Sequence, residues 1–290
     1  MNILKITHSA GFFSCYSKRL EGIVSFFSRY KGAPDQVDSS VQFSLYKANP
    51  IDDLVPFYFK DVPQKISYIR RVQFHNDYQF LDYQDLDIEG LKPFVEQYFS
   101  PSNHVLEIVS LFETTYKIDY THTCAVFYRG NDKATETMLA PYESFIAQAQ
   151  SIEARHPGIV FLVQTDETEF LEAFCAVFPT AIHFEEIPSI RKKVSTVHDE
   201  MPIGERAEFG ARFFAATLVL AKCTYVITHT GNCALWCVLY RGSTTGVYQW
   251  LNHAWKRSSI QRFMIWFKLQ TKILLRKMIK GSIGWIIVRT

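Results

Sequence analysis

The chain has 290 residues, of which 48% are hydrophobic and 21% are charged, with 13 Gly and 11 Pro. This composition excludes a disordered, collagen-like or low-complexity protein, and the length suits two domains. Residues 1–250 carry 22 basic and 29 acidic side chains, whereas residues 251–290 carry nine basic and no acidic ones. We therefore expect no general nucleic-acid surface and treat 251–290 as a separate basic segment.

The chain opens with a predicted strand, loop and helix. Residues 3–7 (ILKIT) are interpreted as a short buried strand, and a helical pattern extends over 16–30. This order is typical of the first unit of a doubly wound α/β domain. Residues 31–118 give weaker signals, and we assign them to the same domain, 1–118. The beginning has no long apolar run, so we expect no signal peptide.

The loop after the first strand is a candidate acceptor or donor contact. It contains His8, Ser9 and Gly11, and we expect it to face the cleft of the first domain. A second interpretation of His8, as a polar residue that ends the strand, remains open.

From residue 120 onward, strands and helices alternate regularly. A β-loop-α pattern repeated three times predicts a parallel sheet with helices on both faces, and ligands of such sheets bind beyond the carboxyl ends of the strands. We assign residues 119–250 to this second domain. The predicted strands are 123–128, 158–164, 181–184 and 224–228, and the predicted helices are 141–155, 169–178, 205–221 and 233–240.

Polar loops follow three of these strands. In RGNDK (129–133), Arg129 offers a planar fork of donors and Lys133 a mobile charge, which together suit a diphosphate, with Asp132 between them to orient either one. A solvated surface turn is the alternative. In QTDET (164–168), Thr165 or Asp166 is expected to cap the next helix, which is compatible with an anion site at that helix start.

The third loop, THTGN (228–232), joins a buried strand to a helix. Its hydroxyl groups, its glycine and Asn232, which we expect to cap the helix start, form a plausible phosphate cradle. The chain has neither a GxGxxG fingerprint nor a GxxxxGK[ST] loop, which disfavours a dinucleotide enzyme or an ATPase.

The order of these segments resembles a known family. FYRGNDKATETMLAPYESFI (127–146) is similar to the first donor-site motif of the α1,6-fucosyltransferases, the group that contains core N-glycan and rhizobial Nod-factor enzymes. That motif reads approximately H-V-R-R-x-D-K, then T-E and a helix led by proline. QTDETEFLEAFCAVFP and TYVITHTGNCALWCVLY resemble later family segments in the same order. The resemblance covers about residues 120–245.

The resemblance implies an α/β fold of the GT-B type, with two Rossmann-like domains whose parallel sheets face a cleft. It implies that Arg129 binds the donor diphosphate, that Lys133 is the motif's lysine and that Glu136 is the catalytic base. Thr230 and Asn232 lie in the loop that corresponds to the family's phosphate-contacting hydroxyl groups. The predicted donor-binding residues are Arg129, Asp132, Lys133, Gln164, Thr165, Asp166, His229, Thr230, Gly231 and Asn232, and the predicted catalytic residues are Arg129 and Glu136.

The implied activity is the transfer of a sugar, by default fucose, from a nucleotide-diphosphate donor, by default GDP-fucose, to a hydroxyl group of a glycan or glycolipid. The implied reaction proceeds with inversion and without a metal or another cofactor. We expect a cytoplasmic protein. Two alternatives remain open: a non-catalytic glycan- or nucleotide-binding module of the same fold, and a transferase or other α/β enzyme that uses another nucleotide.

Three departures from the family pattern keep these alternatives open. The family has a base-contacting histidine where this chain has Phe127, and an acidic residue that reads the base where an ungapped match places Ala215. The second arginine of the motif is replaced by Gly130. The base and the sugar are therefore not defined by the sequence.

The basic segment predicts an amphipathic helix. Lys268, Lys272, Arg276 and Lys280 recur every four residues and form one stripe, while apolar residues fall on another face. We expect 256–290 to contact an anionic membrane surface, which would make the protein peripheral on the inner face of a membrane. The alternative is a final helix that packs across the first domain.

The six cysteines lack a CxxC pair, and we expect free, mostly buried thiols in a reducing compartment.

Overall fold

The computed structural model describes residues 1–63, 66, 71–131, 133, 136–191, 196–279 and 285–289. These form two compact units. Unit 1 comprises Met1–Leu106, Ile203–Gly210 and Ser258–Thr290, and unit 2 comprises Glu107–Pro202 and Ala211–Arg257. The predicted domain borders after residues 118 and 250 both fall within unit 2 and stay predictions about functional domains.

Unit 2 contains a parallel sheet in the order β5-β4-β3-β6-β7, as the alternating pattern predicts. Phe127 on the central strand pairs with Gln164 on one side and with Thr228 on the other. Because all pairs are parallel, the carboxyl ends of the strands line one edge of the sheet. The strands are β3 (Thr123–Tyr128), β4 (Val160–Thr165), β5 (Ile182–His183), β6 (Tyr225–Thr228) and β7 (Val247–Gln249).

Helices connect these strands and confirm the predicted β-loop-α repeats. The four predicted helices each begin or end within a few residues of their predicted bounds, as expected where apolar periodicity is strong. The helix over residues Asn103–Thr115 lies in the region of weak signals and was not predicted. Gly242 ends α8 with φ 71°, a left-handed conformation that glycine adopts without cost. The helices are α4 (Asn103–Thr115), α5 (Tyr142–Arg155), α6 (Thr168–Val177), α7 (Arg206–Lys222) and α8 (Asn232–Arg241), and the first residues of α4 and α7 belong to unit 1.

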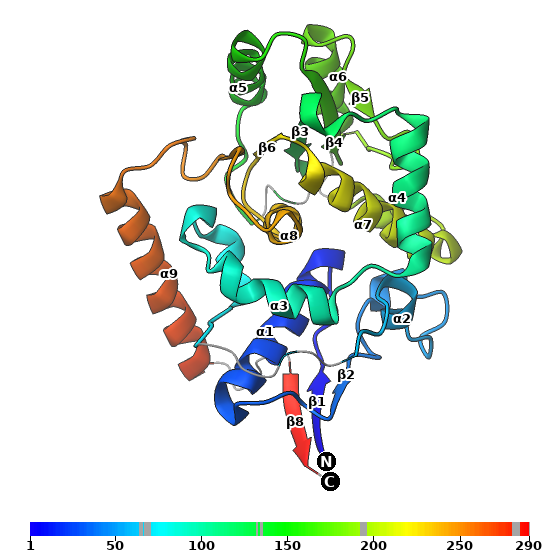
Figure 1. Ribbon diagram of the computed structural model, residues 1–290, viewed down its shortest axis with the longest axis vertical. Helices are drawn as coiled ribbons and strands as arrows, with labels where there is room; N and C mark the ends of the chain where they lie inside the picture. Colours follow the sequence, from blue (N-terminus) through cyan, green and yellow to red (C-terminus); the bar gives the residue numbers. More distant parts are fainter. Residues whose placement is uncertain are drawn as a thin grey trace. The chain divides into compact units, whose positions relative to one another are not determined.

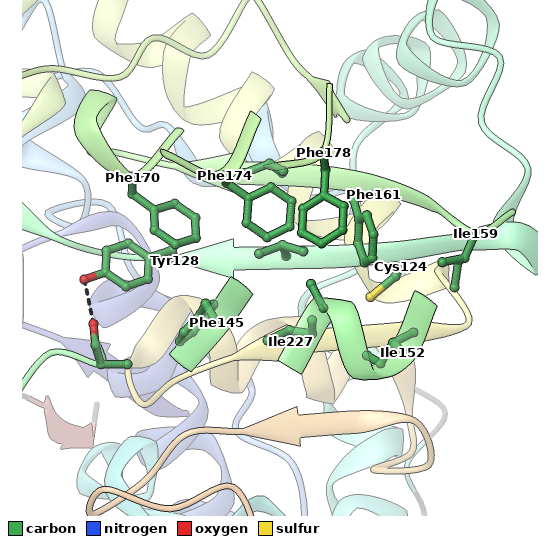
Figure 2. Packing of buried hydrophobic residues seen from close by; sticks show 14 residues of the cluster. Cys124, Tyr128, Phe145, Ile152, Ile159, Phe161, Phe170, Phe174, Phe178 and Ile227 are labelled. Atoms are coloured by element: carbon green, nitrogen blue, oxygen red, sulfur yellow. Dashed lines mark hydrogen bonds between the residues drawn. The ribbon is translucent and has the colours of Figure 1, made fainter. Parts of the chain in front are cut away.

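One face of the unit 2 sheet is covered by an aromatic core (Figure 2). Tyr128 stacks on Phe170 with ring centroids 4.1 Å apart, and its hydroxyl group donates to the carbonyl oxygen of Ala140 at 3.1 Å. This bond ties the end of β3 to the segment that leads into α5, so the loop between them is anchored at both ends. The core also contains Cys124, Val126, Phe145, Ile152, Phe161, Val163, Phe174, Phe178 and Ile227.

Unit 1 opens with the predicted strand, loop and helix. β1 (Asn2–Ile6) leads to α1 (Phe12–Tyr30), which begins four residues before the predicted helix because the backbone turns at Gly11. β1 pairs in parallel with β2 (Gln36–Asp38) and antiparallel with β8 (Trp285–Arg289). The predicted helix of the basic segment therefore does not extend to the end of that segment, whose residues 285–289 form an edge strand of this sheet.

The region that gave weak sequence signals folds as short elements around aromatic side chains. Phe12 contacts Tyr58 and Tyr46 at centroid distances of 4.9 and 5.2 Å. Elements of three to five residues are too short to show a periodicity, which explains the weak signals. They are η1 (Ser44–Tyr46), α2 (Val55–Tyr58), η2 (Asn76–Phe80) and η3 (Tyr83–Asp85), followed by the longer α3 (Ile88–Tyr98); η4 (Tyr120–His122), η6 (Val197–Glu200) and η7 (Ile203–Glu205) lie later in the chain.

The basic helix is α9 (Ser259–Ile279), which packs against η2 within unit 1 (Figure 1). Leu269 and Ile273 are buried against Leu81, which agrees with the alternative that the final helix packs on the first domain. Arg276 donates to both carboxylate oxygens of Asp77, at 2.8 and 2.6 Å. Lys280 lies outside the described residues, and membrane contact stays a prediction. Among the described helices, none has a stretch long and apolar enough to cross a bilayer.

Candidate nucleotide-sugar site

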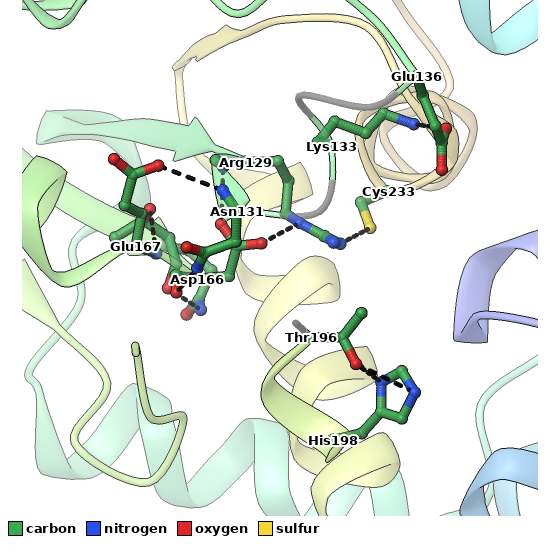
Figure 3. Close-up of polar contacts among 12 residues, drawn as sticks. Arg129, Asn131, Lys133, Glu136, Asp166, Glu167, Thr196, His198 and Cys233 are labelled. Atoms are coloured by element: carbon green, nitrogen blue, oxygen red, sulfur yellow. Dashed lines mark hydrogen bonds and ion pairs between the residues drawn. The ribbon is translucent and has the colours of Figure 1, made fainter. Parts of the chain in front are cut away.

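Arg129 lies at the carboxyl end of β3, and its guanidinium contacts Asp166 and Cys233 (Figure 3). Its Nε donates to Oδ2 of Asp166 at 2.8 Å, and its Nη1 lies 3.3 Å from Sγ of Cys233. Its backbone N–H donates to Nε2 of His229 at 2.8 Å. The loops after β4 and β6 and the first turn of α8 therefore converge on Arg129, in agreement with the predicted clustering of the three polar loops.

Asp166 connects the loop after β4 to the loop after β3. Besides Arg129, its carboxylate accepts the backbone N–H of Gly130 at 2.8 Å, and its carbonyl oxygen accepts the side-chain amide of Asn131 at 2.6 Å. Asn131 has φ 39°, in the left-handed region that asparagine tolerates better than most residues. The expectation that Asp166 caps α6 is wrong, because its carboxylate serves the neighbouring loop and Glu167 precedes the helix without a side-chain cap.

Glu167 occupies the position next to Gly130. It is fully buried, and its Oε2 accepts the backbone N–H of Asn131 at 3.3 Å. A Cβ atom at position 130 would lie 1.5 Å from this oxygen. The glycine that replaces the second motif arginine thus makes room for an acidic side chain from the next loop.

Lys133 lies over the start of α8. Its side chain is almost fully buried, and its ammonium group pairs with the carboxylate of Glu136, which is 48% exposed. Gly231 has φ 136°, and a Cβ atom there would lie 3.1 Å from Cε of Lys133. The loops that contain Lys133 and Gly231 are therefore packed in direct contact. Asp132 lies outside the described residues.

His229 is buried and supports the backbone of Arg129. Burial, followed by the positive charges of Lys133 and Arg129, lowers the pKa of His229 to about 3. The ring is therefore neutral at physiological pH. Because Nε2 accepts from Arg129, the ring proton is on Nδ1.

The THTGN loop leads directly into α8, with Thr230 buried. Asn232 is the first residue of the helix, and Gly231 precedes it without a side-chain cap, so the expected asparagine cap is not formed. A helix carries a partial positive charge at its N-terminus, so the start of α8 is electropositive. Cys233 lies in the first turn, and burial raises the pKa of its thiol.

The two positions implied to read a nucleotide base are buried and apolar. Phe127 is 3% exposed and Ala215 is fully buried. Phe127 lies in register between Gln164 and Thr228, both buried, so a polar group lies on each side of it in the sheet. Gln164 and Thr165 are therefore both residues of the sheet, and the side-chain oxygen of Thr165 accepts the backbone N–H of Glu167 at 3.1 Å.

The predicted first-domain residues lie in unit 1 and contact other parts of that unit. Nε2 of His8 lies 3.0 Å from Oγ of Ser14, and Oγ of Ser9 lies 2.7 Å from Oγ of Ser44. Burial, followed by the charge of Lys18, lowers the pKa of His8. The role of His8, Ser9 and Gly11 toward a ligand stays a prediction.

Asn131, Glu167 and Cys233 were not predicted for this site. Cys233 was interpreted as a core thiol, and the signal that could have indicated its position is its place one residue after THTGN. All six cysteines are free, as expected.

Among the residues that the structure describes, no three His, Cys, Asp or Glu side chains converge to hold a metal ion; metal independence stays a prediction.

No protein-family model matches the chain, and no curated protein matches its sequence. Its fold is similar to solved structures of the NodZ α1,6-fucosyltransferase. The structure with GDP has a TM-score of 0.53 and 14% identity, over 86% of this chain and 93% of that one. The structure soaked with GDP-fucose gives 0.51 and 13% over 83% and 92%, and the Bradyrhizobium enzyme gives 0.52 and 13% over 86% and 94%. The predicted GT-B-like fold is confirmed, and membership of the family stays a prediction.

Proposed function

We propose that the chain is a glycosyltransferase that binds a nucleoside diphosphate sugar at the carboxyl end of β3 in unit 2. The observation that carries this proposal is the position of Arg129. Its side chain is 22% exposed, so it is accessible to a ligand although Asp166 holds it in place. A fixed guanidinium beside a helix start suits a diphosphate. The similarity of the fold to a fucosyltransferase structure that contains GDP supports the same conclusion.

The proposed reaction is a single displacement. An oxygen of the acceptor hydroxyl attacks the anomeric carbon, and the bond from that carbon to the phosphate oxygen breaks with its electron pair on the leaving diphosphate. Arg129 stabilises the charge that develops there, and Lys133 assists. The half-exposed carboxylate of Glu136 takes the proton of the acceptor hydroxyl. Arg129 and Lys133 supply the positive charge that a metal ion provides in other transferases, so we propose that no metal is needed.

GDP-fucose is the proposed donor, and a glycan or glycolipid is the proposed acceptor. A second candidate, a transferase for another nucleotide sugar, is favoured by one observation. Phe127 and Ala215 are buried apolar residues at the positions that the family uses to read guanine, so base selection must use other groups.

The first test is a thermal-shift series with GDP, GDP-fucose, UDP, ADP and CMP. A ligand at about 100 times its Kd stabilises the folded protein by about 2.7 kcal/mol, which raises Tm by several degrees. We expect a GDP shift that is lost in Arg129→Ala. Arg191→Ala is the control, because the exposed Arg191 side chain pairs with Glu172 and not with a residue of the proposed site.

The other outcomes separate the alternatives. A shift with another nucleotide alone would support the second candidate and overturn GDP as the donor. Binding of GDP-fucose without any release of GDP in the presence of glycan acceptors would favour a non-catalytic binding module. An unchanged shift in Arg129→Ala would contradict the proposed site.

A further inference from the structure

Helix α9 has an inner face that holds it to unit 1. Leu269 and Ile273 are buried there, and Arg276 pairs with Asp77, which is almost fully buried. Arg262 pairs with Asp85 near the beginning of the helix. Hydrophobic contacts and two ion pairs thus fix which face of α9 packs on unit 1, and therefore which face lies on the other side of the helix.

The opposite face is apolar and exposed. Its side chains are spaced by three, four or seven residues, so they lie along one side of the helix. Phe263 and Phe267 are 62% and 59% exposed, and their rings stack with centroids 6.2 Å apart. We call this the outer face of α9; it consists of Ile260, Phe263, Met264, Phe267, Leu274 and Leu275, all of which are exposed.

Basic side chains border the outer face. Lys268 and Lys272 follow Met264 at successive steps of four residues, so they lie along one edge of the apolar stripe, and both are exposed. Residues 251–290 contain no acidic residue that would neutralise them. A large exposed apolar patch on a folded protein marks an interaction surface.

We propose that the outer face of α9 docks on a membrane surface that contains anionic phospholipid. The apolar side chains enter the boundary between headgroups and acyl chains, and Lys268 and Lys272 lie against the lipid phosphates. The sequence pattern alone indicates a basic stripe of four residues; the structure assigns Arg276 to the inner face and gives the outer contact to apolar side chains. This proposal does not depend on the identity of the nucleotide or the sugar.

The charge of the segment favours lipid over a second copy of the chain. Two outer faces packed together would bring four lysines into proximity without any acidic partner from α9, which disfavours self-association. A lipid surface offers both components that the outer face lacks: an apolar layer and a layer of negative charge.

The test is co-sedimentation of the purified full chain with vesicles of phosphatidylcholine alone or mixed with phosphatidylglycerol. We expect binding to the mixed vesicles, weakened by salt, and little binding to phosphatidylcholine. Lys268→Gln/Lys272→Gln should weaken binding about 25-fold, because each lysine near an anionic surface contributes about a five-fold factor. Phe263→Ser/Phe267→Ser should weaken it at least as much, because two aromatic anchors are lost.

The control is Ile51→Ser/Leu111→Ser, which removes two exposed apolar side chains elsewhere and should leave binding unchanged. All four substituted residues of the two test variants are exposed, so both variants should stay folded. The lysine variant should lose a little in Tm, because the ammonium group of Lys272 lies over the Phe80 ring, 5.3 Å from its centroid. Binding that survives both test variants, absence of binding, or a dimer in solution that Phe263→Ser/Phe267→Ser disperses would each overturn the proposal.

Discussion

The carboxylate of Glu167 fills the space that a side chain at position 130 would occupy: a Cβ atom there would lie 1.5 Å from Oε2. The same oxygen accepts the backbone N–H of Asn131. The loop after β4 therefore supplies a buried acidic group where the motif that this chain resembles has a second arginine. A carboxylate in place of a guanidinium lowers the positive charge around the proposed diphosphate site, while Arg129 lies at the end of β3.

Gly130→Ala should destabilise the protein. The added methyl group forces the Glu167 carboxylate away from Asn131, and overpacking of this kind costs about 1–3 kcal/mol. The free energy of unfolding from urea denaturation checks this value. If the glycine matters through Glu167, Gly130→Ala should cost clearly less in a Glu167→Ala background, and additive effects of the two substitutions would contradict the relationship.

Asp166→Asn should weaken both the fold and donor binding. The carboxylate accepts bonds from Nε of Arg129 and from N–H of Gly130 with different oxygens, and an amide retains one acceptor oxygen for the two donors. Loss of one such bond to a charged group costs about 1.5–3 kcal/mol of unfolding free energy. We expect nucleotide affinity, measured by calorimetry, to fall about ten-fold. Glu172→Gln, which breaks an exposed ion pair, should change neither quantity appreciably.

His229 should make the protein sensitive to acid. Its pKa is about 3 in the folded state, against an ordinary value of 6.5, because of burial and then the charges of Lys133 and Arg129. Between these pH values the unfolded chain binds a proton at this histidine and the folded chain does not. The contribution of His229 to the free energy of unfolding is therefore complete above pH 6.5 and is lost as the pH falls. From pH 6.5 to 5 the loss is about 2 kcal/mol.

Unfolding experiments with His229→Gln at pH 6.5 and 5 check this contribution. The variant should lose less stability over this interval than the wild type, whatever its stability at pH 6.5. His122→Gln, at an exposed ring, is the matched substitution. An equal acid sensitivity of the wild type and His229→Gln would show that the ring is not buried as a neutral acceptor.

Glu136→Gln tests the proposed general base. Sugar transfer should fall about 10²–10⁴-fold in kcat, while donor affinity changes little. Glu143→Gln, at an acidic residue in the first turn of α5, is the control. A variant that keeps wild-type kcat would show that Glu136 is not the general base. If that variant also binds the donor more weakly, Glu136 acts by holding Lys133 in place.

The unit 2 sheet could be predicted from sequence because its strands are apolar runs and its helices show clear periodicity. The convergence of polar loops at the carboxyl ends of β3, β4 and β6 follows from the parallel topology. The partners of individual residues do not follow from it. Whether Asp166 caps its own helix or binds Arg129 depends on how two loops approach each other in space, and the sequence order of the loops does not contain this information.

Unit 1 was less predictable for a different reason. Its elements between residues 36 and 85 are short, and aromatic packing rather than periodicity determines their positions. Strand β8 follows a basic amphipathic helix, so WIIVR reads as a continuation of that segment. Its pairing with β1 joins distant parts of the chain, which local patterns do not indicate.

The pairing of β8 with β1 has a consequence for the order of folding during synthesis. The residues of unit 2 end at Arg257, so all of them are synthesised before β8. One edge of β1 lacks its partner strand until residues 285–289 emerge. Unit 2 can therefore fold first, while the nascent unit 1 presents an open strand edge that is prone to pairing with other chains.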